Sequence, residues 1–454
     1  MPTIKTRRGL NVPVHGAIQS SEIHEASAPT QVALLPQESW GIKVAMLVQE
    51  GDSVKAGTPL FADRRDEKVT FGSPAAGTVA EIRRGMRRAV LAVVIDVDGD
   101  GCIEVPTLDA DDADGADGAS PETIREALLA SGLWPCLRQR PYDRVAQSGD
   151  TPRGLIVQAY DSRPLSATPH DLLAGRKEAF RHGLGLLHKM TGTKTYLCVA
   201  DGAQWQDWSA PGVTVQAFDG PHPSGTAGFS IHSLCPAGAG AITWHIDAQD
   251  VADIGETFLK GRIPTRRVVA LTGPSANKPR LLATQRGAHV SGLVEGESSA
   301  TETRVITGSV LEGQIANPTD AKSFLGRYSN QISLMDGGTK RDFLAWAMPV
   351  AGRFTTTNTM LDKFFRKTFK FDADSNGSKR AIVPLGAYEK VMPMDILPTQ
   401  LIKALAAHDL ESAEKLGALE LAEEDLALCE FVDTSKQPLT ELLRTMLTRI
   451  EKEG

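Results

Sequence analysis

Residues 48–60 read Val48-Gln-Glu-Gly-Asp-Ser-Val-Lys-Ala-Gly-Thr-Pro-Leu60, and residues 73–79 read Ser73-Pro-Ala-Ala-Gly-Thr-Val79. Beside these phrases, larger and smaller apolar residues alternate at the start of residues 44–48, and apolar and polar residues partly alternate over 77–82, which indicates short strands. Glycines stand at positions 41, 51, 57, 72, 77 and 85, where turns can separate such strands. The first hundred residues are therefore predicted to form short β-strands joined by turns.

The two phrases resemble the barrel-sandwich hybrid fold of biotinyl and lipoyl domains. In those carriers the modified lysine lies at a hairpin tip, eight residues before the proline of the closing S/A-P-x-x-G turn. Here that position before Pro74 holds Asp66, and Lys68 is two residues out of phase. We therefore expect this fold without a covalent carrier function, since function does not follow from fold.

The length of the chain, 454 residues, exceeds what one hydrophobic core organises and predicts three or four domains. A composition of 41% hydrophobic and 23% charged residues is that of a folded protein. Residues 109–118, DADDADGADG, cannot bury apolar surface and are predicted to be a linker. The predicted domains are residues 1–108, 119–261, 262–330 and 331–454.

Residues 119–261 are predicted to form a Rossmann-like α/β domain, because strands and helices alternate there. Strands are expected at 155–159, 196–200, 213–218 and 242–246, with helices after Ser120 and at 171–190 and 249–259. No G-x-G-x-x-G follows a strand. The glycine-rich residues 220–228 contain two prolines and show no helical pattern after them, and residues 273–278 lack the P-loop glycine, so both are predicted to be loops.

The last two domains differ in their patterns. Residues 262–330 predict a small β-rich unit, with strands at 266–271, 280–284, 287–294 and 304–307. Residues 331–454 are expected to be mostly helical. Near their end, apolar residues recur at helical spacing and predict a core-facing stripe: Leu439, Leu442, Leu443, Met446, Leu447 and Ile450.

Charge and apolar runs exclude several classes of protein. A net charge of -7 and the absence of a basic stripe argue against nucleic-acid binding. The strongest basic cluster is Arg83, Arg84, Arg87 and Arg88 around Gly85, for which a solvated turn is favoured over a docking patch. No secretory h-region opens the chain, and no run approaches the roughly 20 apolar residues that span a bilayer. We expect no export and no membrane span.

Residues that could carry chemistry form no recognised constellation. There is no H-E-x-x-H, G-x-S-x-G or C-x-x-C, and the five dispersed cysteines fit reduced thiols. His182 and His188, six apart, do not share a helix face. Residues 96–101 place Asp96, Asp98 and Asp100 like half a calcium loop, but Thr107 stands where a glutamate should close it, so an acidic hairpin turn is favoured. No catalytic, cofactor-binding or metal-binding residue is assigned.

A resemblance covers nearly the whole chain. Residues 5–16 and five later stretches are similar to the A subunit of the sodium-translocating NADH:quinone reductases, with His15 where an alanine is common. The later stretches are Gln249-Asp-Val-Ala-Asp-Ile-Gly255, Arg304-Val-Ile-Thr-Gly-Ser-Val310, Phe324-Leu-Gly-Arg-Tyr-Ser-Asn-Gln-Ile-Ser333, Val391-Met-Pro-Met-Asp-Ile-Leu-Pro398 and Leu416-Gly-Ala-Leu-Glu-Leu-Ala-Glu-Glu-Asp-Leu-Ala-Leu-Cys429.

The resemblance implies a peripheral subunit, on the cytoplasmic side of the bacterial inner membrane, of a six-subunit translocase that transfers electrons from NADH to ubiquinone and exports Na⁺. It implies an SLBB or β-grasp-like fold for residues 262–330. It also places NADH oxidation, flavins and iron–sulfur centres on partner subunits, so no cofactor is expected on this chain. The residues that line any quinone site stay unknown.

Two alternatives remain open. The family is related to the C subunit of Rnf electron-transport complexes and to the flavin-carrying subunit of respiratory complex I. An Rnf-type protein that has lost its iron–sulfur clusters is one alternative, because an intact carrier of that type needs C-x-x-C-x-x-C clusters in the tail, where Cys429 is the single cysteine. Members of the resembled family often read C-x-x-x-C-P there, and Asp433 stands at the second cysteine, so no ligand role is expected for Cys429. A stand-alone nucleotide-binding oxidoreductase is the other, although the glycine loop it needs is missing.

Overall fold

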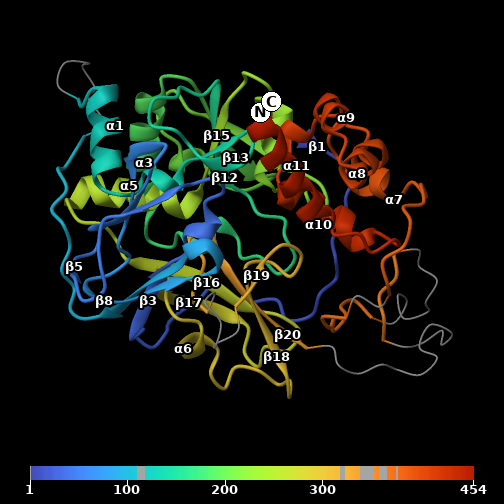
Figure 1. Ribbon diagram of the computed structural model, residues 1–454, viewed down its shortest axis with the longest axis horizontal. Coiled ribbons are helices and arrows are strands. Elements are labelled where there is room, and N and C mark those ends of the chain that lie inside the picture. The colour runs from blue at the N-terminus through green and yellow to red at the C-terminus, as the bar shows by residue number, and fades with distance from the viewer. Residues whose placement is uncertain are drawn as a thin grey trace.

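The computed structural model describes residues 2–109, 118–316, 323–337, 352–356, 366–374 and 377–453. The predicted linker at 109–118 falls almost wholly outside these residues. Figure 1 shows an N-terminal β unit, a central α/β unit, a lower β sheet and a group of C-terminal helices. The mixed α/β, multidomain prediction is confirmed, and no helix of the described ranges is long and apolar enough to cross a membrane.

The N-terminal unit consists of two small sheets, as the alternation predicted. One has the order β3 (Gln31–Leu34), β9 (Val90–Val97), β8 (Gly77–Arg84), β5 (Ser53–Val54), and the other β4 (Val44–Met46), β6 (Pro59–Asp63), β7 (Asp66–Gly72). Between them the rings of Phe61 and Phe71 stack at 4.6 Å, and both side chains are buried. The inward alternation of apolar residues therefore builds this core.

The central unit is a seven-stranded sheet, and its parallel strands confirm the Rossmann-like prediction. The order is β1 (Ile4–Lys5), β14 (Thr214–Asp219), β13 (Lys194–Ala200), β12 (Gly154–Ala159), β15 (Thr243–Asp247), β10 (Arg138–Arg140), β11 (Arg144–Val145). Strand β10 pairs antiparallel with both β15 and β11, and the other strand pairs described in this sheet are parallel. Helix α1 (Pro121–Ala130) begins at the predicted cap, where Ser120 Oγ accepts from Thr123 N.

Successive side chains of strand β12 pack into two different hydrophobic cores, one on each face of the sheet. Leu155 and Val157 pack on the face covered by α3 (Lys177–Thr191) and α5 (Ala248–Lys260). Ile156, between them, packs with the C-terminal helices on the opposite face. Because successive side chains of a strand point to opposite faces, three adjacent apolar residues bind both layers to one sheet.

Two helix predictions in this unit need correction. The helix predicted at 171–190 is divided into α2 (Pro169–Leu172) and α3, because Gly175 adopts a left-handed conformation with φ 77°. A helix not predicted, α4 (Ala227–Leu234), follows the glycine-rich loop, where Thr226 Oγ1 accepts from Phe229 N. Its small residues carried too little apolar periodicity to reveal it.

The lower sheet has the order β19 (Gln314–Ile315), β18 (Thr303–Thr307), β20 (Gln331–Asp336), β16 (Arg266–Thr272), β17 (Arg280–Gln285), β2 (Ile23–Glu25). Three of the four predicted strands are present. The strand predicted at 287–294 is wrong, since the chain turns at Gly287, φ 71°, and forms the short helix α6 (Ser291–Val294).

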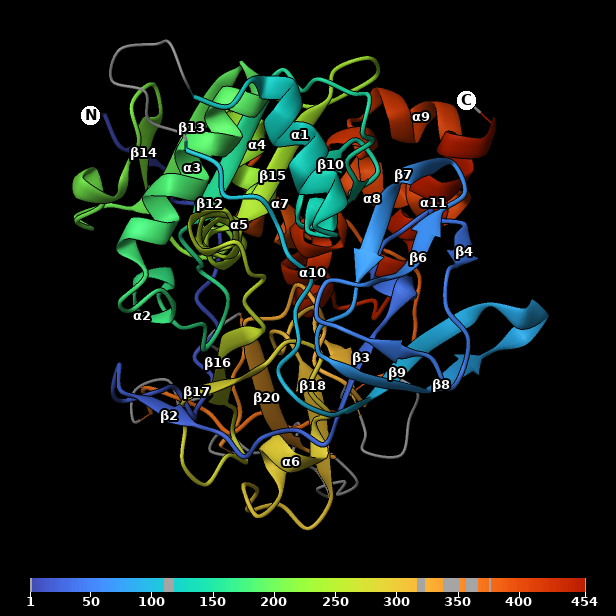
Figure 2. The same ribbon diagram turned by 90° about the vertical axis from the view of Figure 1, so that its left-hand side faces the viewer.

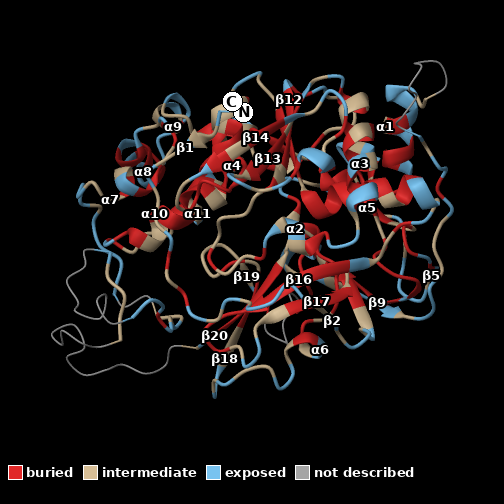
Figure 3. Ribbon diagram, turned by 180° about the vertical axis from the view of Figure 1, so that it is seen from behind, coloured by how far each residue is buried: buried red, intermediate tan, exposed pale blue. Residues whose placement is uncertain are grey.

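The C-terminal helices are α7 (Ala387–Val391), α8 (Pro398–Ala407), α9 (Leu410–Lys415), α10 (Glu423–Val432) and α11 (Leu439–Glu453). Each of these helices contains buried residues, which Figure 3 draws in red. The predicted stripe of α11 is confirmed as core, because Leu439, Leu443, Met446, Leu447 and Ile450 are buried.

The first thirty residues form an extended strap across the other units. Strand β1 pairs with β14, and β2 pairs with β17 of the lower sheet. Between them, Gly9 N donates to Lys390 O at 2.9 Å, and Val14 is buried among the C-terminal helices. The domain boundaries remain predictions, because sheets take strands from both sides of them.

We predict that Gly255→Ala destabilises the protein, although alanine is the better helix former. A Cβ atom at Gly255 would lie 1.8 Å from Ala179 O, so α3 and α5 would have to separate. The expected loss is about 1–3 kcal/mol in urea unfolding followed by circular dichroism.

The matched control is Gly292→Ala in helix α6, where an added Cβ meets nothing within 4 Å. This variant should be neutral or slightly stabilising. Equal stability of the two variants would contradict the close approach of α3 and α5.

Candidate functional site

The candidate site lies at the carboxyl ends of β12 and β15. From β12 the chain continues to β13 and β14 on one side of the sheet, and β15 is then added on the other side of β12. The order in which strands are added therefore reverses between β12 and β15, although these two strands are parallel. Ligands of open α/β sheets bind at such a switch point. Asp161 follows β12 and Asp247 ends β15, so both strands deliver carboxylates to this position.

A cavity of about 600 Å³ occupies this position. Its walls come from the central sheet, the lower sheet, the helices α10 and α11, and residues Glu38 and Trp40 of the N-terminal unit. The charged residues among its lining are mostly acidic: Glu38, Arg138, Asp143, Asp161, Arg163, Asp247, Asp250, Glu312, Glu423, Glu424, Glu441 and Arg444.

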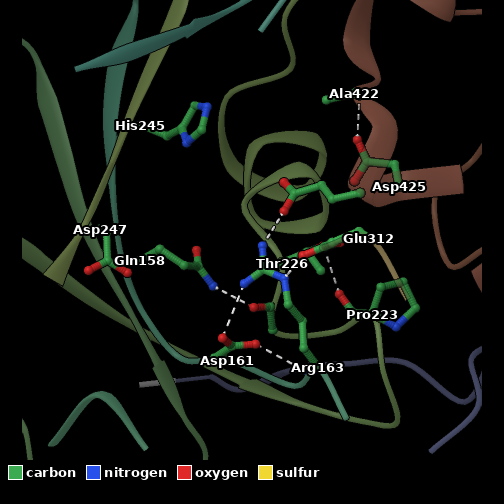
Figure 4. Close-up of polar contacts among 12 residues, drawn as sticks. Gln158, Asp161, Arg163, Pro223, Thr226, His245, Asp247, Glu312, Ala422 and Asp425 are labelled. Atoms are coloured by element: carbon green, nitrogen blue, oxygen red, sulfur yellow. Dashed lines mark hydrogen bonds and ion pairs between the residues drawn. The ribbon is translucent and has the colours of Figure 1, made fainter. Parts of the chain in front are cut away.

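Arg163 is held by carboxylates from three parts of the chain. Its Nη1 lies 3.1 Å from Asp161 Oδ2, its Nη2 lies 2.6 Å from Glu424 Oε2 on α10, and its Nε pairs with Glu312 beside β19. Figure 4 shows Arg163 between Asp161 and Glu312. Burial raises the pKa of Glu312 to about 7 despite Arg163, and Glu424 and Asp161 add to this rise. We call Arg163, Asp161, Glu312 and Glu424 the Arg163 cluster.

A second arginine, which is fully buried, fixes α10 to the central sheet. Arg140, at 0% exposure, bonds to Asp425 Oδ2 at 2.7 Å and to Glu424 Oε1 at 2.9 Å. Its Nε also faces Asp143 Oδ1 at 3.5 Å, and Asp143 is bonded to His245 Nε2 at 3.0 Å. Burial raises the pKa of Asp425 to about 6 although Arg140 opposes the rise. The two arginines thus share Glu424.

A third buried arginine attaches the lower sheet to α5. Arg267 donates to Asp250 Oδ1 at 3.0 Å and to Asn330 Oδ1 at 2.7 Å. Asn330 Nδ2 in turn donates to Asp247 at 2.8 Å. Burial raises the pKa of Asp247 to about 6. One oxygen of Asp250, Oδ2, is buried without a hydrogen bond in the described structure.

The cavity is poorly suited to a nucleotide phosphate. The glycine-rich loop before α4 is bonded within the chain, since Gly225 N donates to Ser162 Oγ at 2.8 Å and Gln158 donates to Gly225 O at 3.0 Å. Asp161 and Glu424 stand beside Arg163, where they would repel an anion. The chemistry of these donors and acceptors therefore does not fit a flavin or dinucleotide phosphate.

Sequence reasoning did not find this cavity. The signal was present, since polar residues follow two predicted parallel strands at Asp161, Arg163 and Asp247. Glu312 and Glu424 were not predictable as their partners, because they are more than 140 residues away and come from other units.

The residues considered in the carrier hypothesis lie elsewhere. Asp66 accepts from Ser148 N at 2.6 Å and from Ser148 Oγ at 2.9 Å, so it joins the N-terminal unit to the α/β unit. Lys68 lies exposed within strand β7 and not at a hairpin tip. The position of a carrier lysine is thus used for contact between units.

The other candidate ligands stay apart. His182 Nε2 lies 2.8 Å from Leu108 O, and His188 Nδ1 lies 3.0 Å from Thr195 Oγ1, so the two rings serve different contacts. Cys429 is buried in α10, and burial raises the pKa of its thiol. All five cysteines are free. Within the described ranges no group of three His, Cys, Asp or Glu side chains could hold a metal ion.

The acidic loop after β9 does not close the predicted hairpin. Gly101 O accepts from Ala56 N at 2.9 Å, and Ile103 N donates to Ala56 O, so the chain continues beside Ala56 and does not return along β9. Asp96 accepts from Gln31 at 2.8 Å. The loop is acidic, but its hydrogen bonds direct the chain toward the α/β unit.

Comparisons with known proteins agree with this arrangement of units. Three domain families match: the NqrA N-terminal barrel-sandwich hybrid domain over residues 4–98, the NqrA second alpha/beta domain over 119–263, and the SLBB family described as NQRA C-terminal domain over 268–317. The A subunit of the Na(+)-translocating NADH-quinone reductase of Hahella chejuensis (strain KCTC 2396) is 43% identical over 452 residues, which are 99% of this chain and 100% of the relative. The chain belongs to this NqrA family.

Other members are similar over the same extent. The corresponding A subunits of Yersinia pestis and of Neisseria meningitidis serogroup C are 42% and 44% identical, each over 99% of this chain and 100% of the relative. A solved NAD⁺-reducing [NiFe]-hydrogenase has a TM-score of 0.40 and 13% identity, covering 73% of this chain and 61% of that chain. The family match confirms the barrel-sandwich, Rossmann-like and SLBB predictions.

We predict that Arg163→Gln destabilises the protein by about 1–3 kcal/mol at neutral pH. This cost is smaller than that of removing one partner of a fully buried ion pair, because the Arg163 side chain is partly exposed. The variant leaves Asp161, Glu312 and Glu424 without their shared cation. Without Arg163 the pKa of Glu312, already raised by burial, should rise further, and the pKa of Glu424, now lowered by Arg163, should rise. These carboxyls then take up protons in the folded state at pH values where the unfolded chain leaves them ionised. The stability deficit should therefore grow as the pH rises from 5 to 8.

Unfolding by urea at several pH values measures this deficit. Arg449→Gln, which removes an exposed pair with Glu453, is the control and should change stability little at any pH. A deficit of Arg163→Gln that shrinks toward pH 8 would contradict the role given to the Arg163 cluster.

Proposed function

We propose that this chain is the peripheral subunit, on the cytoplasmic side of the bacterial inner membrane, of a sodium-pumping NADH:ubiquinone oxidoreductase. In this role it contributes to electron transfer to ubiquinone coupled to Na⁺ export, without independent activity. The observation that carries the proposal is the match of the whole chain to relatives named as the A subunit of a Na(+)-translocating NADH-quinone reductase, at 42–44% identity over their full length.

In the proposed complex the cofactors are bound by other subunits, and this chain holds none of its own. NADH oxidation, flavins and iron–sulfur centres belong to partner subunits, and ubiquinone is the substrate of the complex. The acidic switch-point cavity supports this assignment, because Asp161, Asp247 and Glu424 disfavour a flavin or nicotinamide phosphate. The alternative of an Rnf-type C subunit without its clusters gains no support from the three matching families.

The proposed partners are the membrane subunits and the NADH-oxidising subunit of a six-subunit complex. Neither nucleic acid nor a membrane span of its own enters the proposal. Hydrophobic quinones need apolar walls and few polar groups, so their binding leaves little trace in a motif. The quinone-contacting residues therefore stay unassigned, and contact at an interface between subunits is part of the proposal.

We predict that a complex purified without this protein loses quinone reduction but still oxidises NADH with an artificial acceptor. The isolated protein should show no flavin or iron–sulfur absorption and no NADH oxidation. Full quinone reduction by a complex that lacks it, or NADH oxidation by the isolated protein, would defeat the proposal.

A further inference from the structure

A second hollow adjoins the switch-point cavity, with which it shares Trp40 and Gln314, and lies mostly on the N-terminal unit. It is a groove of about 1010 Å³ between the tip of the β8–β9 hairpin and strand β4. Figure 2 shows this hairpin projecting from the body of the molecule, with β4 at the edge of its sheet nearby. We call this hollow the arginine groove, after four arginines that line it: Arg64, Arg84, Arg87 and Arg88.

The arginines of the groove lack acidic partners. No aspartate or glutamate is among the described residues that line the groove, and none of the four arginines takes part in an ion pair of the described structure. Arg84 donates to the backbone oxygen of Arg88 at 3.3 Å. Neighbouring Arg83 differs, because it pairs with Glu81 and covers the Phe324 ring. Four like charges around one hollow repel one another unless an anion enters.

The floor of the groove is apolar. Trp40 is 39% exposed, and Ile42, Val44 and Met46 are partly buried beside it. A phosphate or another small anion would leave these side chains in water. The combination fits a ligand that carries carboxylates and apolar side chains together.

Strand β4 offers free backbone groups at the same place. In the described structure β6 is its one strand neighbour, and bonds from Lys43 and Leu47 run toward β6. The alternation of an antiparallel ladder then turns the N–H and C=O groups of Val44 and Met46 away from β6. An exposed edge of this kind accepts an additional strand.

We propose that the arginine groove binds an extended acidic segment, with apolar side chains at alternate positions, from another subunit of the complex. The segment adds a strand to β4, its apolar side chains cover Trp40 and Ile42, and its carboxylates meet Arg87 and Arg88. A flat membrane surface fits less well, because the apolar residues form the floor and not the rim. That the partner is another subunit of the complex rests on the proposed function. That the groove suits an acidic, partly apolar strand rests on the groove residues alone.

The test uses a blocked, fluorescein-labelled nine-residue peptide in which glutamate alternates with valine, added to the full-length protein. Fluorescence anisotropy should report saturable binding that weakens with added salt, and tryptophan emission should change. The emission change should vanish in Trp40→Phe when both proteins compared also carry Trp346→Phe, because Trp134, Trp205, Trp208 and Trp244 are buried and Trp346 lies outside the described residues. A peptide of lysine and valine should not bind.

The double variant Arg87→Glu with Arg88→Glu should weaken peptide binding about ten-fold or more. Arg7→Glu with Arg8→Glu reverses another exposed pair of consecutive arginines and should leave binding unchanged. Met46→Glu should weaken peptide binding, because it places a negative charge in the apolar floor of the groove. Thermal unfolding of each arginine variant should match the parent, since the exchanged arginines are exposed.

Three outcomes would overturn the inference: no peptide binding, binding that the Arg87 and Arg88 exchange leaves intact, or equal binding of a peptide of glutamate and serine. Preferential binding to vesicles of anionic phospholipid, lost in the same double variant, would overturn it in favour of a lipid surface. The peptide assay needs no other subunit, so its failure leaves the proposed function standing, and failure of the deletion experiment leaves the groove standing.

Discussion

The ion pairs of Arg163 are the interaction on which the arrangement of the units depends. One guanidinium is shared by Asp161 of the α/β unit, Glu312 of the lower sheet and Glu424 of the C-terminal helices. Charges removed from water must be compensated, and each of these carboxylates is compensated only when its unit is in place. The cluster therefore specifies how three separately patterned parts of the chain fit together.

The same charges make the switch point of this Rossmann-like domain unfavourable for a nucleotide phosphate. In such domains the switch point is open to a ligand, and its glycine loop leaves backbone N–H groups free for phosphate. Here Ser162 and Gln158 engage the loop at Gly225, and acidic side chains of other units enclose the cavity. Contacts between units occupy the position where other members of the fold hold a ligand.

Local patterns made most of the fold predictable. The apolar residues 155–157 were predicted to lie in a strand, the Ser120 cap located α1, and the Leu439 stripe located α11. Helix α4 and the break at Gly175 were missed because backbone conformation and tertiary packing decided them. The candidate site was missed for a related reason: Glu312 and Glu424 reach Arg163 only after distant units pack together, and no local spacing encodes such a contact.

The strap of the first thirty residues has a consequence for synthesis of the chain on the ribosome. Strand β1 must wait for β14, β2 for β17, and Gly9 for the backbone of Lys390. The segment made first is therefore fixed last, after nearly the whole polypeptide has emerged. Until then the outer edges of two sheets stay open, and a chain released early would expose both.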